Sequence, residues 1–130
     1  MNSPVFHATL VSHTHWDRAW YCTFQEYRIR LVRLVDHLLD ILENDPGFHV
    51  FMLDGQLSVL EDYLEIRPDH AVRLQQLCRS GRLQVGPWYV LADEFLVSPE
   101  ALIRNLMVGR RMGLPYGGVM SIGYVPDGFG

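Results

Sequence analysis

Residues 13–20 read His-Thr-His-Trp-Asp-Arg-Ala-Trp and follow an apolar, β-prone run that predicts a strand over residues 5–12. Alternate side chains of a strand point to the same face, so an extended backbone would place His13, His15 and Asp17 on one side. Imidazole and carboxylate together suit Zn²⁺ or another divalent cation. Two ordinary strand histidines followed by a helix-capping aspartate would also fit the pattern. The aspartate and the two flanking tryptophans favour the metal site.

Beyond this stretch, helical and strand patterns alternate along the chain. Thr23 and Glu26 have the spacing of a capping box, and apolar residues then recur at helical spacing up to the breaker residues 44–47. Further helical patterns cover residues 57–64, 68–80 and 99–112, and further strand patterns cover residues 48–53, 83–85 and 119–124. Such alternation favours a parallel sheet, so the predicted fold class is α/β with about four strands and intervening helices.

Polar or aromatic residues follow each predicted strand. Asp17 follows the first strand, Asp54 the second, residues 88–94 the third and Asp127 the fourth. Sites in parallel α/β folds form at the carboxyl ends of the strands, so these residues are predicted to share one face. For Asp54, which precedes a glycine, a turn role is favoured over a functional one. For Asp127, a turn role and a role as metal ligand or nucleophile are equally supported by the local sequence.

Several residues near this face are candidates for substrate binding. Trp20 and Trp88 lie beside the polar cluster rather than within the apolar periodic runs, and sugar rings stack on such aromatic faces, although core packing is the commoner role. Asp93 and Glu94 are adjacent, so their side chains diverge and only one of them is expected to line a pocket. Trp20, Trp88 and Asp93 are therefore the predicted substrate-binding residues.

Composition narrows the class of protein. The chain has 130 residues, 48% of them hydrophobic, a net charge of −4 and dispersed arginines, which together predict one packed domain and no nucleic-acid footprint. No apolar run approaches the ~20 residues that a membrane span needs, and no signal-peptide pattern begins the chain. The two cysteines do not form a disulfide framework. The expected location is cytoplasmic, with no nucleic-acid or membrane partner.

Three motifs resemble the N-terminal catalytic domain of glycoside hydrolase family 38, the α-mannosidases. Residues 13–20 resemble its His-x-His-x-Asp opening, residues 86–94 (Gly-Pro-Trp-Tyr-Val-Leu-Ala-Asp-Glu) resemble its Gly-x-Trp-Val-x-Pro-Asp-Glu segment, and residues 124–130 (Tyr-Val-Pro-Asp-Gly-Phe-Gly) resemble the segment that carries its catalytic aspartate. The motifs occur in the family order and cover nearly the whole chain. Bacterial members, including those that act on mannosylglycerate-type substrates, are the most similar.

The resemblance implies a zinc-dependent retaining glycosidase that cleaves terminal α-mannosides or mannosylglycerate-like substrates. It implies that His15, Asp17 and Asp127 ligate Zn²⁺, with His13 in a supporting role. Asp127 would also be the catalytic nucleophile and form a glycosyl-enzyme intermediate. Trp20 would stack against the mannose. The implied fold is a seven-stranded parallel β/α barrel, and the resemblance allows a homo-oligomer without indicating one.

The chain departs from the family pattern at Ala19, where many bacterial members have Glu, and at Ala92, where the family has Pro. The family's fourth zinc ligand and general acid lie beyond residue 130, so residues 1–130 are expected to be the N-terminal portion of a longer catalytic domain. One alternative is a metal-dependent barrel of the amidohydrolase kind, whose bridging lysine finds no counterpart because this chain contains no lysine. The other is a non-catalytic sugar-binding remnant.

Overall fold

A long amphipathic helix, α1 (Phe24–Asn44), begins at the predicted capping box. The computed structural model describes residues 4–128 of the chain. The Thr23 hydroxyl oxygen accepts the backbone N–H of Glu26 at 3.4 Å, and the Glu26 carboxylate accepts the backbone N–H of Thr23 at 2.8 Å. The helix ends where Asp45 and Gly47 close a turn. Local sequence signals therefore define both ends of α1 correctly.

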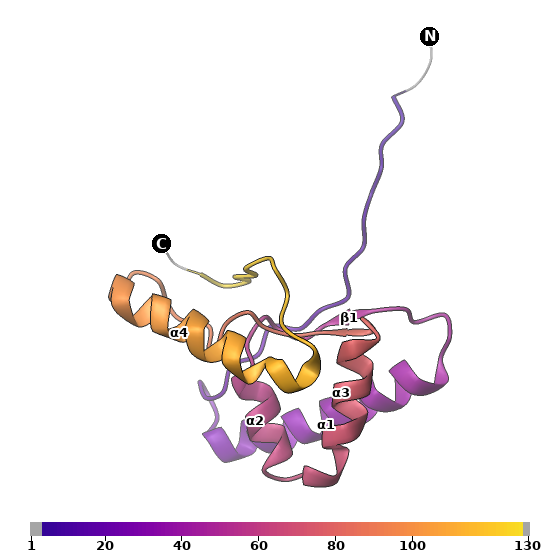
Figure 1. The fold of residues 1–130 in the computed structure, drawn as a ribbon, viewed down its shortest axis with the longest axis horizontal. Helices are drawn as coiled ribbons and strands as arrows, with labels where there is room; N and C mark the ends of the chain where they lie inside the picture. Colours follow the sequence, from indigo (N-terminus) through magenta and orange to yellow (C-terminus); the bar gives the residue numbers. More distant parts are fainter. Residues whose placement is uncertain (1–3, 129–130) are drawn as a thin grey trace.

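The core lies between α1 and the two helices that follow it, α2 (Ser58–Leu64) and α3 (Ala71–Arg79). In Figure 1, α1 crosses behind α2 and α3. The most deeply buried core side chains come from all three helices and from the strand ends, namely Leu31, Val35, Leu39, Leu42, Leu53, Leu57, Val59, Leu60, Tyr63 and Leu74. The helical patterns predicted these segments. One detail differs, because Pro68 opens a short 3₁₀ helix, η1 (Pro68–His70), before α3 begins.

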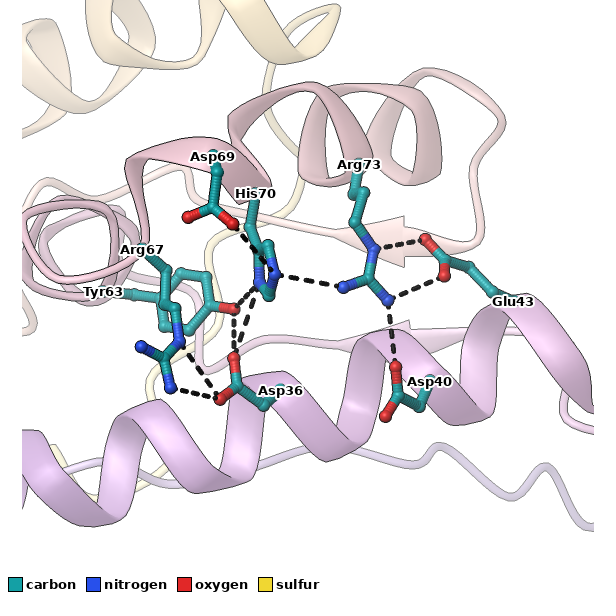
Figure 2. Close-up of polar contacts among 8 residues, drawn as sticks. All are labelled: Asp36, Asp40, Glu43, Tyr63, Arg67, Asp69, His70 and Arg73. Atoms are coloured by element: carbon teal, nitrogen blue, oxygen red, sulfur yellow. Dashed lines mark hydrogen bonds and ion pairs between the residues drawn. The ribbon is translucent and has the colours of Figure 1, made fainter.

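A polar network joins the outer edge of these helices (Figure 2). Tyr63 is fully buried, and its hydroxyl oxygen lies 2.6 Å from Asp36 Oδ1 and 2.5 Å from His70 Nδ1. Arg67 donates to Asp36 Oδ2 at 3.2 Å, and Arg73 donates to Glu43 at 2.7 Å and 2.9 Å. Through these hydrogen bonds and ion pairs the network links α1 to α2, η1 and α3.

The sheet is parallel but shorter than predicted. It consists of β1 (Phe51–Met52) and β2 (Leu83–Gln84), with Phe51 opposite Leu83 and Met52 opposite Gln84. The helices α2, η1 and α3 form the crossover between the two strands. The predicted strands over residues 48–53 and 83–85 are therefore correct in position and too long in extent.

The other two predicted strands are not formed. Residues 5–12 are extended but project away from the body of the fold in Figure 1, with Phe6 86% and Leu10 95% exposed. Residues 119–124 likewise carry no strand. Each segment makes one backbone hydrogen bond beside the sheet. Met52 N–H donates to Ser12 O at 2.9 Å, and Met120 N–H donates to Val85 O, just after β2, at 3.0 Å. A strand needs a continuous ladder of such bonds, and one bond does not supply it.

These two contacts nevertheless arrange the segments in chain order. Residues 12–14 lie beside β1, β1 pairs with β2, and Met120 lies beside the end of β2. Within residues 4–128 the fold is α/β, as predicted, with a two-stranded parallel sheet in place of the four strands expected. No helix in that part of the chain combines the length and the apolar composition that crossing a membrane would require.

The helix α4 (Pro99–Met112) holds the segment that follows β2. Its start is as predicted, because Ser98 caps the helix by accepting the Ala101 N–H at 3.2 Å and Pro99 occupies the first turn. The Asn105 side chain accepts the backbone N–H groups of Tyr89 and Val90, both at 2.9 Å. A short 3₁₀ helix, η2 (Leu114–Tyr116), then leads back towards the sheet. The 86–94 segment is thereby fixed at the strand ends.

Candidate metal centre

His15 lies at the centre of three carboxylates that come from three different parts of the chain. Its Nε2 atom lies 3.8 Å from Asp17 Oδ2 and 3.6 Å from Asp127 Oδ2. Its Nδ1 atom lies 3.8 Å from Asp54 Oδ1. Folding therefore brings the 13–20 stretch, the end of β1 and the 124–128 segment together.

The donor set of His15, Asp17 and Asp127 is compatible in chemistry and spacing with zinc. Two ligands at about 2.1 Å from a tetrahedral zinc hold their donor atoms roughly 3.4 Å apart. The two spacings at His15 Nε2 exceed this value only slightly. Among residues 4–128, however, no three His, Cys, Asp or Glu side chains converge closely enough to hold an ion by themselves. The His15–Asp17 and His15–Asp127 spacings are close to those of a zinc site, but the three side chains do not converge on one point.

A cavity of about 510 Å³ opens beside these residues. His15, Trp16, Asp17, Gln56, Asp93 and Asp127 are among the residues that line it. A volume of this size accommodates a small organic ligand such as a sugar ring. Glu94, the neighbour of Asp93, lines a different and much smaller hollow with Trp88. The two adjacent carboxylates thus line two different cavities.

Two side chains that sequence reasoning did not single out fix the 13–20 stretch. Arg18 donates two hydrogen bonds to the buried Asp62 carboxylate of α2, both at 2.7 Å. This two-pronged contact is the strong form of an arginine–carboxylate pair, and Asp62 holds the pKa of Arg18 above its usual value. Gln56 donates to the Trp16 carbonyl oxygen at 2.8 Å and accepts the Leu91 N–H at 3.3 Å. No spacing rule links these residues, because their partners are distant in sequence.

Asp54 makes the turn that its local sequence predicts, and its side chain has a further feature. Its backbone does turn, with φ of 42° followed by 67° at Gly55, but its side chain is fully buried and faces His15. Burial raises the pKa of Asp54 to about 6, against the opposing effects of a hydrogen bond from Gln56 and the nearby His15 ring. The turn explains the backbone conformation of Asp54 but not the buried position of its carboxylate.

Unpaired buried polar atoms concentrate at this site. Within residues 4–128, the buried side-chain atoms without a hydrogen-bond partner are Thr14 Oγ1, Asp54 Oδ1 and Asp93 Oδ1. Thr14 adjoins His15, and Asp93 lines the cavity. Native proteins leave few such groups unpaired, and those that remain call for an explanation such as a bound ion or ligand.

The remaining predicted site residues do not line this cavity. His13 contacts Tyr124, whose hydroxyl oxygen lies 2.6 Å from His13 Nδ1. Trp88 donates from Nε1 to the Tyr124 carbonyl oxygen at 3.2 Å. Trp20 is 76% exposed and packs edge-on against Tyr21. The structure therefore brings His15, Asp17, Asp93 and Asp127 to one cavity, whereas His13, Trp20 and Trp88 are not part of its lining.

Known proteins are similar to this chain over nearly all of its length. A protein of Halalkalibacterium halodurans named "Putative mannosylglycerate hydrolase" is 46% identical over 124 residues, which are 95% of this chain and 14% of that protein. The human protein Alpha-mannosidase 2C1 is 32% identical over 126 residues, 95% of this chain and 12% of its own length. The chain thus spans only 12–14% of the length of these relatives.

Solved structures agree with the sequence relatives. The crystal structure of an alpha-mannosidase from Enterococcus faecalis V583 matches 91% of this chain and 13% of its own, with 44% identity and a TM-score of 0.88. Residues 5–130 match the family described as glycosyl hydrolases family 38, N-terminal domain. This match includes the 13–20, 86–94 and 124–130 motifs. The chain therefore belongs to glycoside hydrolase family 38.

Proposed function

We propose that this chain forms part of a zinc-dependent retaining α-mannosidase-type glycoside hydrolase. The observation that carries the proposal is the position of His15, whose Nε2 atom faces the Asp17 and Asp127 carboxylates beside a cavity of about 510 Å³. Relatives named as α-mannosidases and as a mannosylglycerate hydrolase support terminal α-mannosides or mannosylglycerate-like compounds as substrates. The family match favours this function over an amidohydrolase.

In the proposed centre, His15, Asp17 and Asp127 hold Zn²⁺. The bound ion would hold sugar hydroxyl groups and favour a ring shape close to the oxocarbenium-like transition state. The Arg18–Asp62 pair keeps the 13–20 stretch, and with it His15 and Asp17, in place before a ligand arrives. This pre-organisation reduces the ordering that binding would otherwise require.

Asp127 is the proposed nucleophile. It is exposed to the cavity, so its carboxylate can reach a sugar bound there. One carboxylate oxygen would form a bond to the anomeric carbon while the glycosidic C–O bond breaks, and water would later hydrolyse the glycosyl ester. A retaining reaction also needs an acid that protonates the leaving oxygen. The family resemblance places that acid, and a fourth zinc ligand, after residue 130.

Within this proposal, Asp93, which lines the cavity, binds sugar hydroxyls. Trp20 and Trp88 are further substrate-binding residues, and His13 supports the centre. The two-stranded sheet would be the start of a seven-stranded β/α barrel, because residues 12–14, β1, β2 and Met120 already lie side by side in chain order. In such a barrel the segments 5–12 and 119–124 would gain the neighbours that a strand requires.

The test is hydrolysis of p-nitrophenyl α-mannoside by the full-length protein. We expect turnover that a chelator abolishes and added Zn²⁺ restores, with the first-formed sugar keeping its α-configuration in NMR spectra. Asp17→Asn is expected to lose both zinc binding and turnover, whereas Asp40→Asn on the outer face of α1 should retain both. Zinc-independent turnover would overturn the metal assignment. Mannose binding without turnover would identify a sugar-binding remnant instead.

A further inference from the structure

The Asp54 carboxylate lies directly behind the candidate metal centre. It has no exposed surface, and its Oδ2 atom accepts a hydrogen bond from Gln56 at 2.5 Å. Its Oδ1 atom has no hydrogen-bond partner and lies 3.8 Å from His15 Nδ1. The other nitrogen of the same ring faces Asp17 and Asp127. The imidazole of His15 is therefore placed between one buried carboxylate and two carboxylates that border the cavity.

The chemistry of histidine gives this arrangement a role. An imidazole that binds a metal through Nε2 must carry its proton on Nδ1, and this N–H needs an acceptor. A closure of about 1 Å would bring Asp54 Oδ1 within hydrogen-bond distance of Nδ1. We propose that Asp54 is a positioning residue that accepts the Nδ1–H of His15 and thereby fixes the ring with Nε2 towards the metal. This inference rests on the proposed zinc function.

The backbone around Asp54 holds the carboxylate firmly. Leu53 N–H donates to Gln84 O of β2 at 2.9 Å, and Trp88 N–H donates to Gly55 O at 3.1 Å, so both neighbours of Asp54 are bonded to the next segment. An asparagine would also suit the left-handed φ of 42° and would bury no charge. The turn alone therefore does not explain why a carboxylate occupies this position.

The test compares zinc affinity and stability in full-length wild type, Asp54→Asn and Asp36→Asn. Asp36→Asn is the matched control, because it removes a partly buried carboxylate from the network between α1 and α2. We expect Asp54→Asn to weaken Zn²⁺ affinity about tenfold, as loss of a partner behind a ligand does, while the melting temperature without zinc stays constant or rises. Asp36→Asn should lower the melting temperature and leave zinc affinity unchanged.

A spectroscopic measurement separates positioning from a merely structural role. In the zinc-loaded wild type, the His15 Nδ1–H resonance should be shifted downfield by its carboxylate acceptor, and Asp54→Asn should move it upfield. Equal zinc affinity in wild type and Asp54→Asn, together with loss of binding in Asp17→Asn, would overturn this inference and leave the proposed function intact. If the wild type itself binds no zinc, the proposed function and this inference both fail.

Discussion

Asp36 and Asp54 are two aspartates that folding removes from full contact with water, and their surroundings differ sharply. Burial opposes ionisation of Asp36, but hydrogen bonds from Tyr63 and Arg67 outweigh it and lower its pKa. At Asp54 burial prevails over the hydrogen bond from Gln56 and raises the pKa to about 6. The neighbours of Asp36 outweigh the effect of burial on its ionisation, whereas the neighbours of Asp54 do not.

The same difference extends to the two regions around these residues. In the network between the helices, Tyr63, His70 and Arg73 all have protein partners (Figure 2). At the strand ends, Thr14, Asp54 and Asp93 carry the buried side-chain atoms that lack a partner within residues 4–128. The helical region thus pairs its polar groups internally, whereas the strand-end region holds buried polar atoms without a protein partner.

The largest effect is expected from a variant that disrupts the site and leaves the core intact. Asp127→Asn should lower kcat on the order of 10⁴-fold, because it removes the proposed nucleophile. The Asp127 side chain is 64% exposed, so the free energy of unfolding should change by less than about 0.5 kcal/mol. Initial rates and urea denaturation measure the two quantities. A large loss of stability would show that site and core are not separable.

The opposite test uses a variant that disrupts the core and leaves the site intact. Leu39 on α1 has no exposed surface, so Leu39→Ala should lower the free energy of unfolding by about 2–5 kcal/mol. Zinc affinity of the folded protein should stay the same, because α1 contributes none of the proposed ligands. Urea denaturation and a zinc titration at low urea check this prediction. Weaker zinc binding by the folded variant would link the two regions.

A smaller effect is expected in the helical network. Tyr63→Phe removes the hydroxyl that contacts Asp36 and His70 and should reduce the free energy of unfolding by roughly 1–3 kcal/mol. Tyr89→Phe is the control, because the Tyr89 hydroxyl bonds the exposed Glu61 at 3.0 Å. That change should stay within about 0.5 kcal/mol. Equal losses in the two variants would contradict the assignment of stability to the buried network.

The smallest expected effect is a change in how the free energy of unfolding depends on pH. The pKa of Asp36 is lower in the folded chain than its ordinary value of 3.8, so its contribution to stability is present above that value and is lost as pH falls through the folded pKa. Asp36→Asn should therefore be less stable than wild type near neutral pH, and the difference should shrink on acidification below pH 3.8. Urea denaturation at a series of pH values measures this. A stability difference that grows on acidification would contradict a stabilising effect of ionised Asp36.

The sequence was most informative where structure depends on neighbours along the chain. Thr23 with Glu26 and Ser98 with Pro99 predicted the starts of α1 and α4, because a cap bonds to backbone groups only three residues away. The order of the segments beside the sheet followed from α/β alternation, although residues 5–12 and 119–124 form no strand. The same alternation predicted that His15, Asp17 and Asp127 lie near one another. The motifs at 13–20, 86–94 and 124–130 also led to the correct family.

Tertiary structure decided what depends on distant partners. Strand extent was overestimated at residues 5–12 and 119–124, because an extended segment becomes a strand only where another segment bonds to it. The Arg18–Asp62 pair joins residues 44 positions apart, and no local pattern predicts it. The local sequence of Asp54 signals a turn, which it makes, but only the folded chain shows its buried carboxylate facing His15. The sequence determined which chemistry is present, and the packing of β1 against its neighbours decided which groups meet.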